Sequence, residues 1–173
     1  MASDLQDPEA VLVGVGALEE DPEGDLVLTD SFRADWRAEI EDVKDSDAKR
    51  EEIAEILETE RGDVSFEAFD EAFKIMVDDT VVGILESQAA FYADTAGARL
   101  LRERYDDWGE LSVADRSRLL KGLRLFFEQC PECGYDVTFD TKEVESCCGS
   151  HAVAAVDCGG CGARLFESAP LRE

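Results

Sequence analysis

Four cysteines near the C-terminal end are the residues whose type and spacing could carry chemistry. They form two CxxC-Gly motifs, Cys130-Pro131-Glu132-Cys133-Gly134 and Cys158-Gly159-Gly160-Cys161-Gly162. A tetrahedral Zn²⁺ takes four thiolates at about 2.3 Å, and two intervening residues let one tight turn present two sulfurs to the same side of the ion. The spacing therefore predicts a four-thiolate metal site with Cys130, Cys133, Cys158 and Cys161 as ligands.

The residues around the cysteines suit such turns. Gly134 and Gly162 follow the second cysteine of each motif, where a positive φ closes the turn and only glycine adopts it without cost. Pro131 presets φ at the first position between Cys130 and Cys133. In this geometry the backbone N–H groups can point at the sulfurs and spread their negative charge.

Between the motifs the sequence is typical of short strands. Tyr135, Val137 and Phe139 alternate with polar residues, and residues 152–156 and 164–166 are short apolar runs. A sheet of this size buries too little surface to fold alone, so a bound metal would supply much of its folding free energy.

With these motifs, residues 130–167 resemble a zinc ribbon of the rubredoxin-knuckle type, with CPECG as the first knuckle and CGGCG as the second. The resemblance implies Zn²⁺ in a structural site. Iron is the alternative, because tetrahedral four-cysteine sites accept both metals. The wider resemblance is to small haloarchaeal zinc-ribbon proteins, which implies no particular activity.

Three further possible ligands, Cys147, Cys148 and His151, lie between the two motifs. We interpret the two cysteines as strand residues, one facing a small core and one facing outward, and His151 as an exposed turn residue. The alternatives are that Cys148 or His151 replaces a knuckle cysteine at the metal, or that the two adjacent thiols have a redox role.

The residues before the first motif predict a mostly helical domain with one small hairpin. Asp21-Pro22-Glu23-Gly24 is a turn between apolar segments, which predicts a hairpin near residues 17–28. Gly97 lies in a run of small residues and predicts a close helix crossing or a bend. Apolar periodicity and capping residues predict helices over residues 8–18, 30–44, 47–60 (ended by Gly62), 65–76, 80–105 and 112–129.

The composition is strongly acidic. Of 173 residues, 42 are Asp or Glu and 17 are Lys or Arg, which gives a net charge of −25. In dilute salt the many carboxylates of such a chain repel one another. In molar salt the Debye length falls to about 3 Å and this repulsion largely disappears. The composition resembles that of proteins from extreme halophilic archaea. We found no signal-peptide pattern and no apolar run long enough to span a membrane, so a cytoplasmic location is expected.

The basic residues gather in one stretch. Seven of them lie in residues 99–124, among them the candidate partner-binding residues Arg99, Arg102, Arg116, Lys121 and Arg124. One interpretation is ion pairing on solvated helix faces. The other is a surface that binds a nucleic acid or an acidic protein, since clustered bases are typical of such surfaces.

The sequence contains few signs of an enzyme. A single histidine excludes HExxH metal sites and most catalytic triads, and neither GxSxG nor GxxxxGK[ST] occurs. We therefore expect a non-enzymatic zinc-binding protein that acts through protein or nucleic-acid contacts, with a regulatory role. A rubredoxin-like iron electron carrier and an enzyme with its site in the helical domain and a structural zinc remain as alternatives. The predicted fold is α+β, with a mainly helical domain over residues 1–129 and a three-stranded zinc ribbon over residues 130–173.

Overall fold

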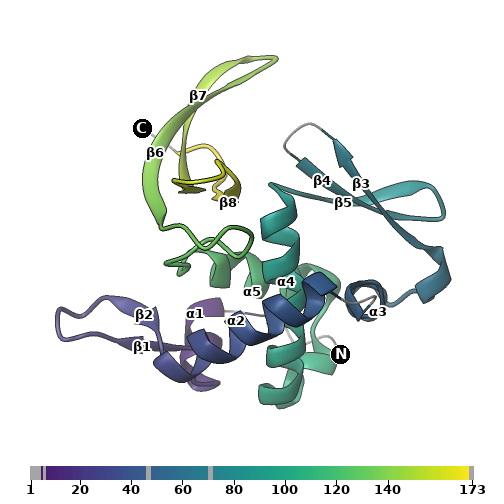
Figure 1. Ribbon diagram of the computed structural model, residues 1–173, viewed down its shortest axis with the longest axis horizontal. Helices are drawn as coiled ribbons and strands as arrows, with labels where there is room; N and C mark the ends of the chain where they lie inside the picture. The colour runs from purple at the N-terminus through teal and green to yellow at the C-terminus, as the bar shows by residue number, and fades with distance from the viewer. Residues whose placement is uncertain (1–4, 6, 46–47, 70–71, 172–173) are drawn as a thin grey trace.

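A computed structural model describes residue 5 and residues 7–45, 48–69 and 72–171. Figure 1 shows a helical base from which two sheets project on the same side. The helices are α1 (Pro8–Gly14), α2 (Asp30–Asp45), α3 (Ala48–Ile56), α4 (Gln88–Arg104) and α5 (Val113–Arg124). The strands are β1 (Leu18–Glu20), β2 (Leu26–Leu28), β3 (Val64–Phe69), β4 (Ala72–Val77), β5 (Thr80–Leu85), β6 (Val137–Ser146), β7 (Gly149–Cys158) and β8 (Arg164–Glu167).

The first elements follow the sequence prediction except at the end of α1. Asp7 caps α1 by accepting hydrogen bonds from the N–H groups of Glu9 and Ala10. The helix ends earlier than predicted, because Gly16 turns the chain with a φ of +77° and β1 begins two residues later. Strands β1 and β2 then form the predicted hairpin, with Leu18 opposite Leu28. Helix α2 covers the predicted range to within one residue.

Helix α4 lies at the centre of the helical region and packs against both α2 and α5. On α2, Phe32, Trp36, Ile40 and Val43 are all buried, as their spacing along one stripe predicts. The Nε1–H of Trp36 donates a 3.0 Å hydrogen bond to the carbonyl of Ala93 on α4. This contact satisfies the only polar atom of a fully buried indole and ties α2 to the middle of α4.

The prediction of helices over residues 65–76 and 80–105 was wrong in part. Residues 64–85 form an antiparallel three-stranded sheet in the order β3-β4-β5, and α4 begins only at Gln88. The three–four–three spacing of Phe66, Phe69, Phe73 and Met76 imitated a helical stripe. β-branched and aromatic residues are abundant in this stretch, and a period of two joins Val64 to Phe66 in β3 and Phe73 to Ile75 in β4, all of which face the core.

Tertiary contacts select the strands. The rings of Phe66 and Phe73 stack on each other across β3 and β4. Their centroids lie 4.8 Å and 4.6 Å from the ring centroid of Phe91 on α4. The β4–β5 turn uses Asp78 and Asp79, whose φ angles are +50° and +63°. Positive φ at both central residues is the geometry of a tight hairpin turn, usually signalled by Asn-Gly or Asp-Gly rather than by two aspartates.

Two other helix ends differ from the prediction. Helix α3 ends at Ile56, and Glu58 rather than Gly62 takes the left-handed conformation, with a φ of +56°. Helix α5 begins as predicted, because Ser112 Oγ accepts a hydrogen bond from the N–H of Asp115. It ends at Arg124, so a short segment of turns, and not the helix itself, leads to Cys130.

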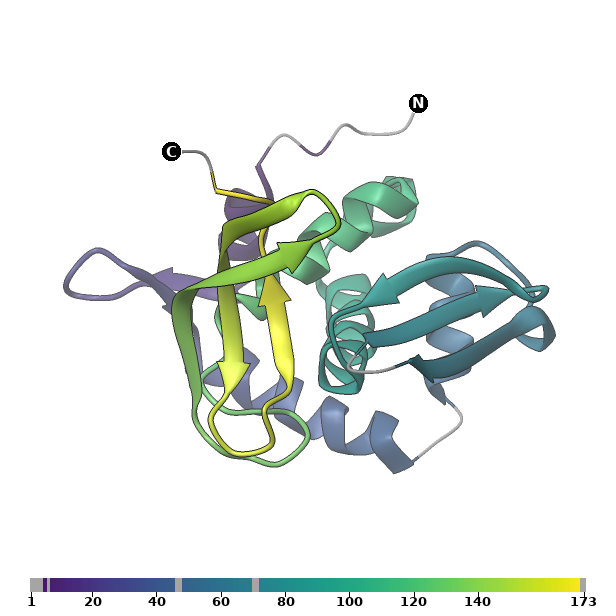
Figure 2. The same cartoon turned by 90° about the horizontal axis from the view of Figure 1, so that it is seen from above.

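The C-terminal part is the predicted three-stranded sheet, in the order β6-β7-β8. Strands β6 and β7 pair over their whole length, from Val137 opposite Cys158 to Ser146 opposite Gly149. Figure 2 shows this sheet beside the β3–β5 sheet, with α4 and α5 beneath them. The fold is thus α+β, and in the described part of the chain no helix combines the length and apolarity that crossing a membrane requires.

Gly97 provides a test of the packing at the centre of the helical region. A Cβ atom there would lie 3.2 Å from a methyl carbon of Leu120 and 3.4 Å from one of Leu123, as expected for a close helix crossing. We predict that Gly97→Val lowers the free energy of unfolding by about 1–3 kcal/mol, through overpacking.

Gly122 is the matched control, because it also lies inside a helix but a Cβ atom added to it would meet nothing within 4 Å. Gly122→Ala should raise the free energy of unfolding by about 0.5–1 kcal/mol. Urea unfolding followed by circular dichroism measures both variants. Equal effects of the two substitutions would contradict the close crossing.

Candidate metal centre

The two cysteine motifs fold into equivalent turns. In the first, the N–H of Gly134 donates to the carbonyl of Cys130 at 2.9 Å, and in the second the N–H of Gly162 donates to that of Cys158 at 3.2 Å. Gly134 and Gly162 have φ angles of +78° and +76°, which confirms the conformation predicted from their positions. Each turn therefore presents its two sulfurs from the same side of the chain.

The N–H groups of each turn point at the sulfur of its first cysteine. Cys130 Sγ accepts from the N–H of Glu132 at 3.4 Å. Cys158 Sγ accepts from the N–H groups of Gly160 and Cys161 at 3.3 Å and 3.4 Å. Such bonds spread the charge of a thiolate and orient it before a metal arrives.

The fold brings the four sulfurs together from both motifs. Their Sγ atoms all lie within 4.8 Å of one another, with Cys130 to Cys161 at 3.8 Å and Cys133 to Cys158 at 3.3 Å. Thiolates at about 2.3 Å from a tetrahedral ion would lie about 3.8 Å apart, so the cluster has the dimensions of a single site. The four cysteines could hold one metal ion, and among the described residues they form the only such group of three or more ligands.

The thiols of this cluster differ in acidity. Burial raises the pKa of Cys130 to about 12. Burial acts in the same direction on Cys158, but the N–H groups of its own turn and neighbouring thiols outweigh it and lower its pKa to about 7. A cation that binds all four sulfurs must therefore displace protons, and its affinity should fall as the pH falls.

The two turns also pack directly on each other. The N–H of Gly159 donates to the carbonyl of Asp136 at 3.1 Å, which joins the second turn to the segment that follows the first. A Cβ atom on Gly160 would lie 2.6 Å from the ring of Tyr135. The Tyr135 ring therefore leaves no room for a side chain at position 160, where the first motif has Glu132.

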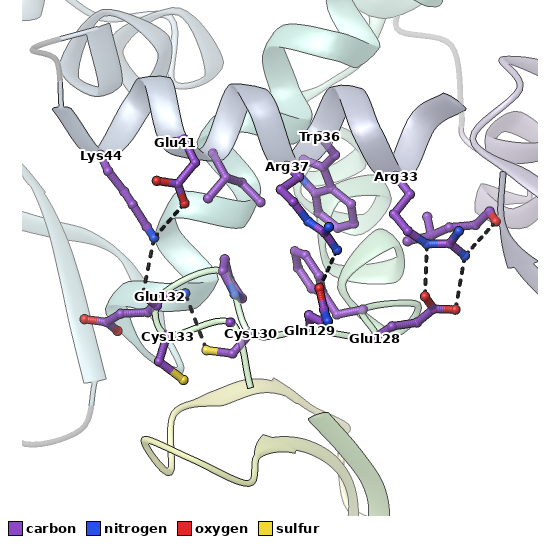
Figure 3. A pocket seen from close by; sticks show the side chains of 15 residues that line it. Arg33, Trp36, Arg37, Glu41, Lys44, Glu128, Gln129, Cys130, Glu132 and Cys133 are labelled. Carbon is purple, nitrogen blue, oxygen red and sulfur yellow. Dashed lines mark hydrogen bonds and ion pairs between the residues drawn. The ribbon is translucent and has the colours of Figure 1, made fainter. Parts of the chain in front are cut away.

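Helix α2 holds the first turn on the helical region, as Figure 3 shows. The Arg33 guanidinium makes two contacts with the Glu128 carboxylate, at 2.9 Å and 3.1 Å. Further along the helix, Lys44 Nζ donates to the carbonyl of Glu132, between the two ligands of the first turn, at 3.4 Å. Trp36 and Phe127 stack beneath them with their ring centroids 4.0 Å apart.

These residues line a cavity of about 370 Å³ between α2 and the first turn. On its wall, Arg33 and Lys44 pair with the carboxylates of Glu128 and Glu41, whereas Arg37 donates to the neutral amide oxygen of Gln129. The sequence predicted the buried apolar face of α2 correctly. It did not predict that basic residues of this helix contact residues 128–132, because these partners lie about 90 positions apart in the sequence.

A buried ion cluster joins the C-terminal sheet to the helices. Arg124 at the end of α5 lies 2.6 Å from Glu86 and 2.9 Å from Asp94 on α4, and it donates to the carbonyl of Leu165 on β8 at 2.5 Å. Ser87 caps α4 and donates from its hydroxyl to the carbonyl of Arg164 at 2.6 Å. Both contacts end on backbone carbonyls of β8, so they fix the position of that strand against the helices.

The five candidate partner-binding residues do not form one exposed surface. Arg99 and Arg102 on α4 make ion pairs with acids of α2 and α3, among them Glu52. Lys121 lies 3.8 Å from Glu86. These pairs join different elements, whereas the sequence suggested pairs within one helix.

The other two, Arg116 and Arg124, are buried. Arg116 donates to the carbonyls of Glu55 and Ile56 at the end of α3, and also to those of Trp108 and Gly109. Its guanidinium lies 5.5 Å from the Trp108 ring centroid. This arginine therefore satisfies the free carbonyls at a helix end, which is a structural task.

The interpretation of Cys147 and Cys148 as strand residues was wrong. They form the two-residue turn between β6 and β7, both are exposed, and their Sγ atoms lie 3.5 Å apart. His151, interpreted as a turn residue, lies in β7 opposite Val144 and is partly buried. None of the three belongs to the four-cysteine group.

Comparisons with known proteins identify a family but no activity. Residues 7–125 match the family model described as the central domain of a family of unknown function, DUF8054, and residues 128–168 match the model of its C-terminal domain. The comparisons with curated proteins and with solved structures found no match.

The first prediction from this site concerns the ligands. Cys133→Ser and Cys161→Ser each remove one exposed thiolate, and each should reduce the metal content of the purified protein from about one ion per chain to near zero after dialysis against a chelator. Because the turns are then no longer joined, protection of the β6–β8 amides in hydrogen exchange should fall as well. Elemental analysis and hydrogen exchange measure the two effects.

Cys147→Ser is the matched control, since it makes the same chemical change at the other end of the same hairpin. It should retain the full metal content. Equal metal loss in the control, or full retention in Cys133→Ser, would contradict the assignment of the ligands.

The second prediction concerns Asp94. Burial raises its pKa to about 6 from an ordinary value of 3.8, in spite of the neighbouring Arg124. As the pH rises, Asp94 ionises in the unfolded chain before it ionises in the folded protein. The neutral carboxyl therefore contributes its full stabilisation at a pH below its ordinary pKa, and this stabilisation is lost as the pH rises through about 6.

Asp94→Asn keeps the side chain neutral at every pH. Between about pH 4 and pH 7 the stability of the wild type, relative to this variant, should fall by up to about 3 kcal/mol, at about 1.4 kcal/mol per pKa unit. Urea unfolding of both proteins across this range measures the difference. Parallel stability curves would show that Asp94 ionises as easily in the folded protein as in the unfolded chain.

Proposed function

The chain belongs to the DUF8054 family, and we propose that it is a non-enzymatic zinc protein that acts by contact with another protein. The observation that carries this proposal is the group of four cysteine sulfurs, all within 4.8 Å of one another. Four thiolates complete the coordination of a tetrahedral Zn²⁺, so such a site leaves no open position for water or a substrate. The metal would then stabilise the fold, and function would depend on the surface that it holds in place.

The distribution of charge favours a protein partner over a nucleic acid. Nine arginines of the described residues take part in ion pairs with the chain's own acids, namely Arg33, Arg61, Arg99, Arg102, Arg104, Arg116, Arg118, Arg124 and Arg164. Binding to a phosphate backbone depends on cations that are free to replace counterions. A chain with a net charge of −25 and its arginines used internally offers few of them.

Exposed aromatic residues lie close to the candidate metal centre. Tyr135 and Phe139, at the start of the C-terminal sheet, are 66% and 65% exposed. Aromatic residues are enriched at protein interfaces, where they bury a large area at a low cost in conformational entropy. We therefore place the contact surface on this side of β6, beside the first cysteine turn.

Iron is the alternative occupant, because a tetrahedral four-thiolate site of these dimensions accepts it as well as zinc. An iron-loaded protein would be coloured and could carry electrons. The experiment that separates the two is elemental analysis of protein purified without added metal. We expect about one zinc per chain and no visible absorption, whereas stoichiometric iron would overturn the zinc assignment.

A binding experiment tests the kind of partner. Fluorescence anisotropy with labelled duplex DNA and structured RNA should show no binding at about 0.1 M or about 2 M KCl, since counterion release has few free cations to act on. Affinity capture in a high-KCl extract should recover a protein partner with the wild type and less of it with Phe139→Ser. Binding of DNA or RNA that weakens with salt would contradict a protein-contact function.

The charge leads to a further prediction about salt. Acids exceed bases by 25. Salt should therefore weaken the repulsion among the acids by more than it weakens the attraction within the ion pairs. We predict that the midpoint of thermal unfolding rises by at least about 5 °C between about 0.1 M and 2 M KCl. Choline chloride at equal ionic strength is the control for specific potassium binding, and a midpoint that falls with salt would contradict halophilic adaptation.

A further inference from the structure

The tip of the β6–β7 hairpin carries two adjacent thiols that the candidate metal centre does not use. Cys147 and Cys148 form the turn itself, and both are exposed and outside any disulfide. Neighbouring residues of a strand point to opposite faces, so adjacent cysteines in β6 or β7 could not have met. The turn places both thiols on one side, with their Sγ atoms 3.5 Å apart.

The hairpin separates this pair from the candidate metal centre. Cys158, a predicted ligand, stands opposite Val137 at the base of the ladder, and Ser146 stands opposite Gly149 at its tip. At about 3.3 Å per residue, the two ends lie about 30 Å apart along the strands. Figure 1 shows the tip pointing away from the helices, where a ligand can reach it from solvent. The two groups of thiols can therefore react independently.

The distance between the sulfurs indicates what the pair can bind. A direct disulfide requires an S–S distance of about 2.05 Å, so the sulfurs would have to approach by about 1.5 Å within a two-residue turn. Two thiolates that share one tetrahedral atom at about 2.3 Å lie about 3.8 Å apart, and a narrower angle at a pyramidal atom brings them closer to the 3.5 Å observed. The turn is therefore better arranged to chelate one soft atom than to form a disulfide.

Only an atom that needs no more than two protein ligands suits the tip of the hairpin. Among the described residues, no group of three or more cysteine, histidine or carboxylate ligands forms at the tip, so a tetrahedral zinc ion would lack half of its ligands there. Trivalent arsenic with one organic substituent needs only two thiolates, and soft thiolate sulfur is the ligand that such an atom prefers.

We propose that Cys147 and Cys148 form a dithiol site for trivalent arsenicals at the tip of the hairpin. With phenylarsine oxide as the probe, two As–S bonds form and the arsenic–oxygen bond breaks. The oxygen leaves as water with the two thiol protons, and arsenic remains trivalent. No oxidant or reductant takes part. The proposal is independent of which metal the four-cysteine centre holds.

The test is a titration of the full-length, metal-loaded protein with phenylarsine oxide, followed by native mass spectrometry. We expect one adduct per chain with the metal retained, and release of the adduct by ethanedithiol but not by a monothiol at equal thiol concentration. Cys147→Ser and Cys148→Ser should each weaken binding by about 100-fold or more, because chelation by the second thiol is lost.

His151→Ala is the control variant, and it should bind the probe as the wild type does, since His151 lies in β7 and not in the turn. Metal content measured on every variant shows that the rest of the sheet is intact. Wild-type affinity in either serine variant would overturn the proposal. So would an adduct that forms only as the metal is released, because arsenic would then occupy the four-cysteine centre.

Discussion

Four sulfur atoms within 4.8 Å of one another are the constraint on which the C-terminal part of the structure depends. Thiolates at this distance repel one another, and burial already opposes the ionisation of Cys130 by raising its pKa. A shared cation relieves both costs at once. The remainder of the sheet is a long two-stranded ribbon with one short third strand, which offers little buried surface of its own. A metal shared by the two cysteine turns would add to the small core around Val156 and Leu165 that packs this sheet against α4.

That junction is itself held by contacts with the helices. Residues from α2 bind the first turn from one side, through Arg33 and Lys44. On the other side, Arg124 and Ser87 donate hydrogen bonds to two successive carbonyls of β8. Cysteines from two turns can share an ion only if both turns remain in place. The helical region thus contributes to the geometry of the site, although it supplies none of the four cysteines.

The limited supply of basic residues accounts for much of the remaining architecture. With 17 bases and 42 acids, each arginine has a choice of acidic partners, and most arginines of the described part of the chain join elements that are distant in sequence. Arg116 on α5 also donates hydrogen bonds to the backbone carbonyls at the end of α3. The acids left over cover the surface. This division explains why a basic stretch of sequence does not become a basic surface.

The sequence by itself determined the features that depend on neighbouring residues. Both cysteine turns, their positive-φ glycines, the β1–β2 hairpin and the stripe of α2 follow from local spacing, because the interactions that form them span only a few positions. The tertiary structure decided residues 64–85, where Phe66 and Phe73 fit a helical or a strand period and the Phe91 ring selects the strand. It also decided which arginines are buried and that Cys147 and Cys148 meet at a turn, because burial and turn position depend on partners that no local pattern specifies.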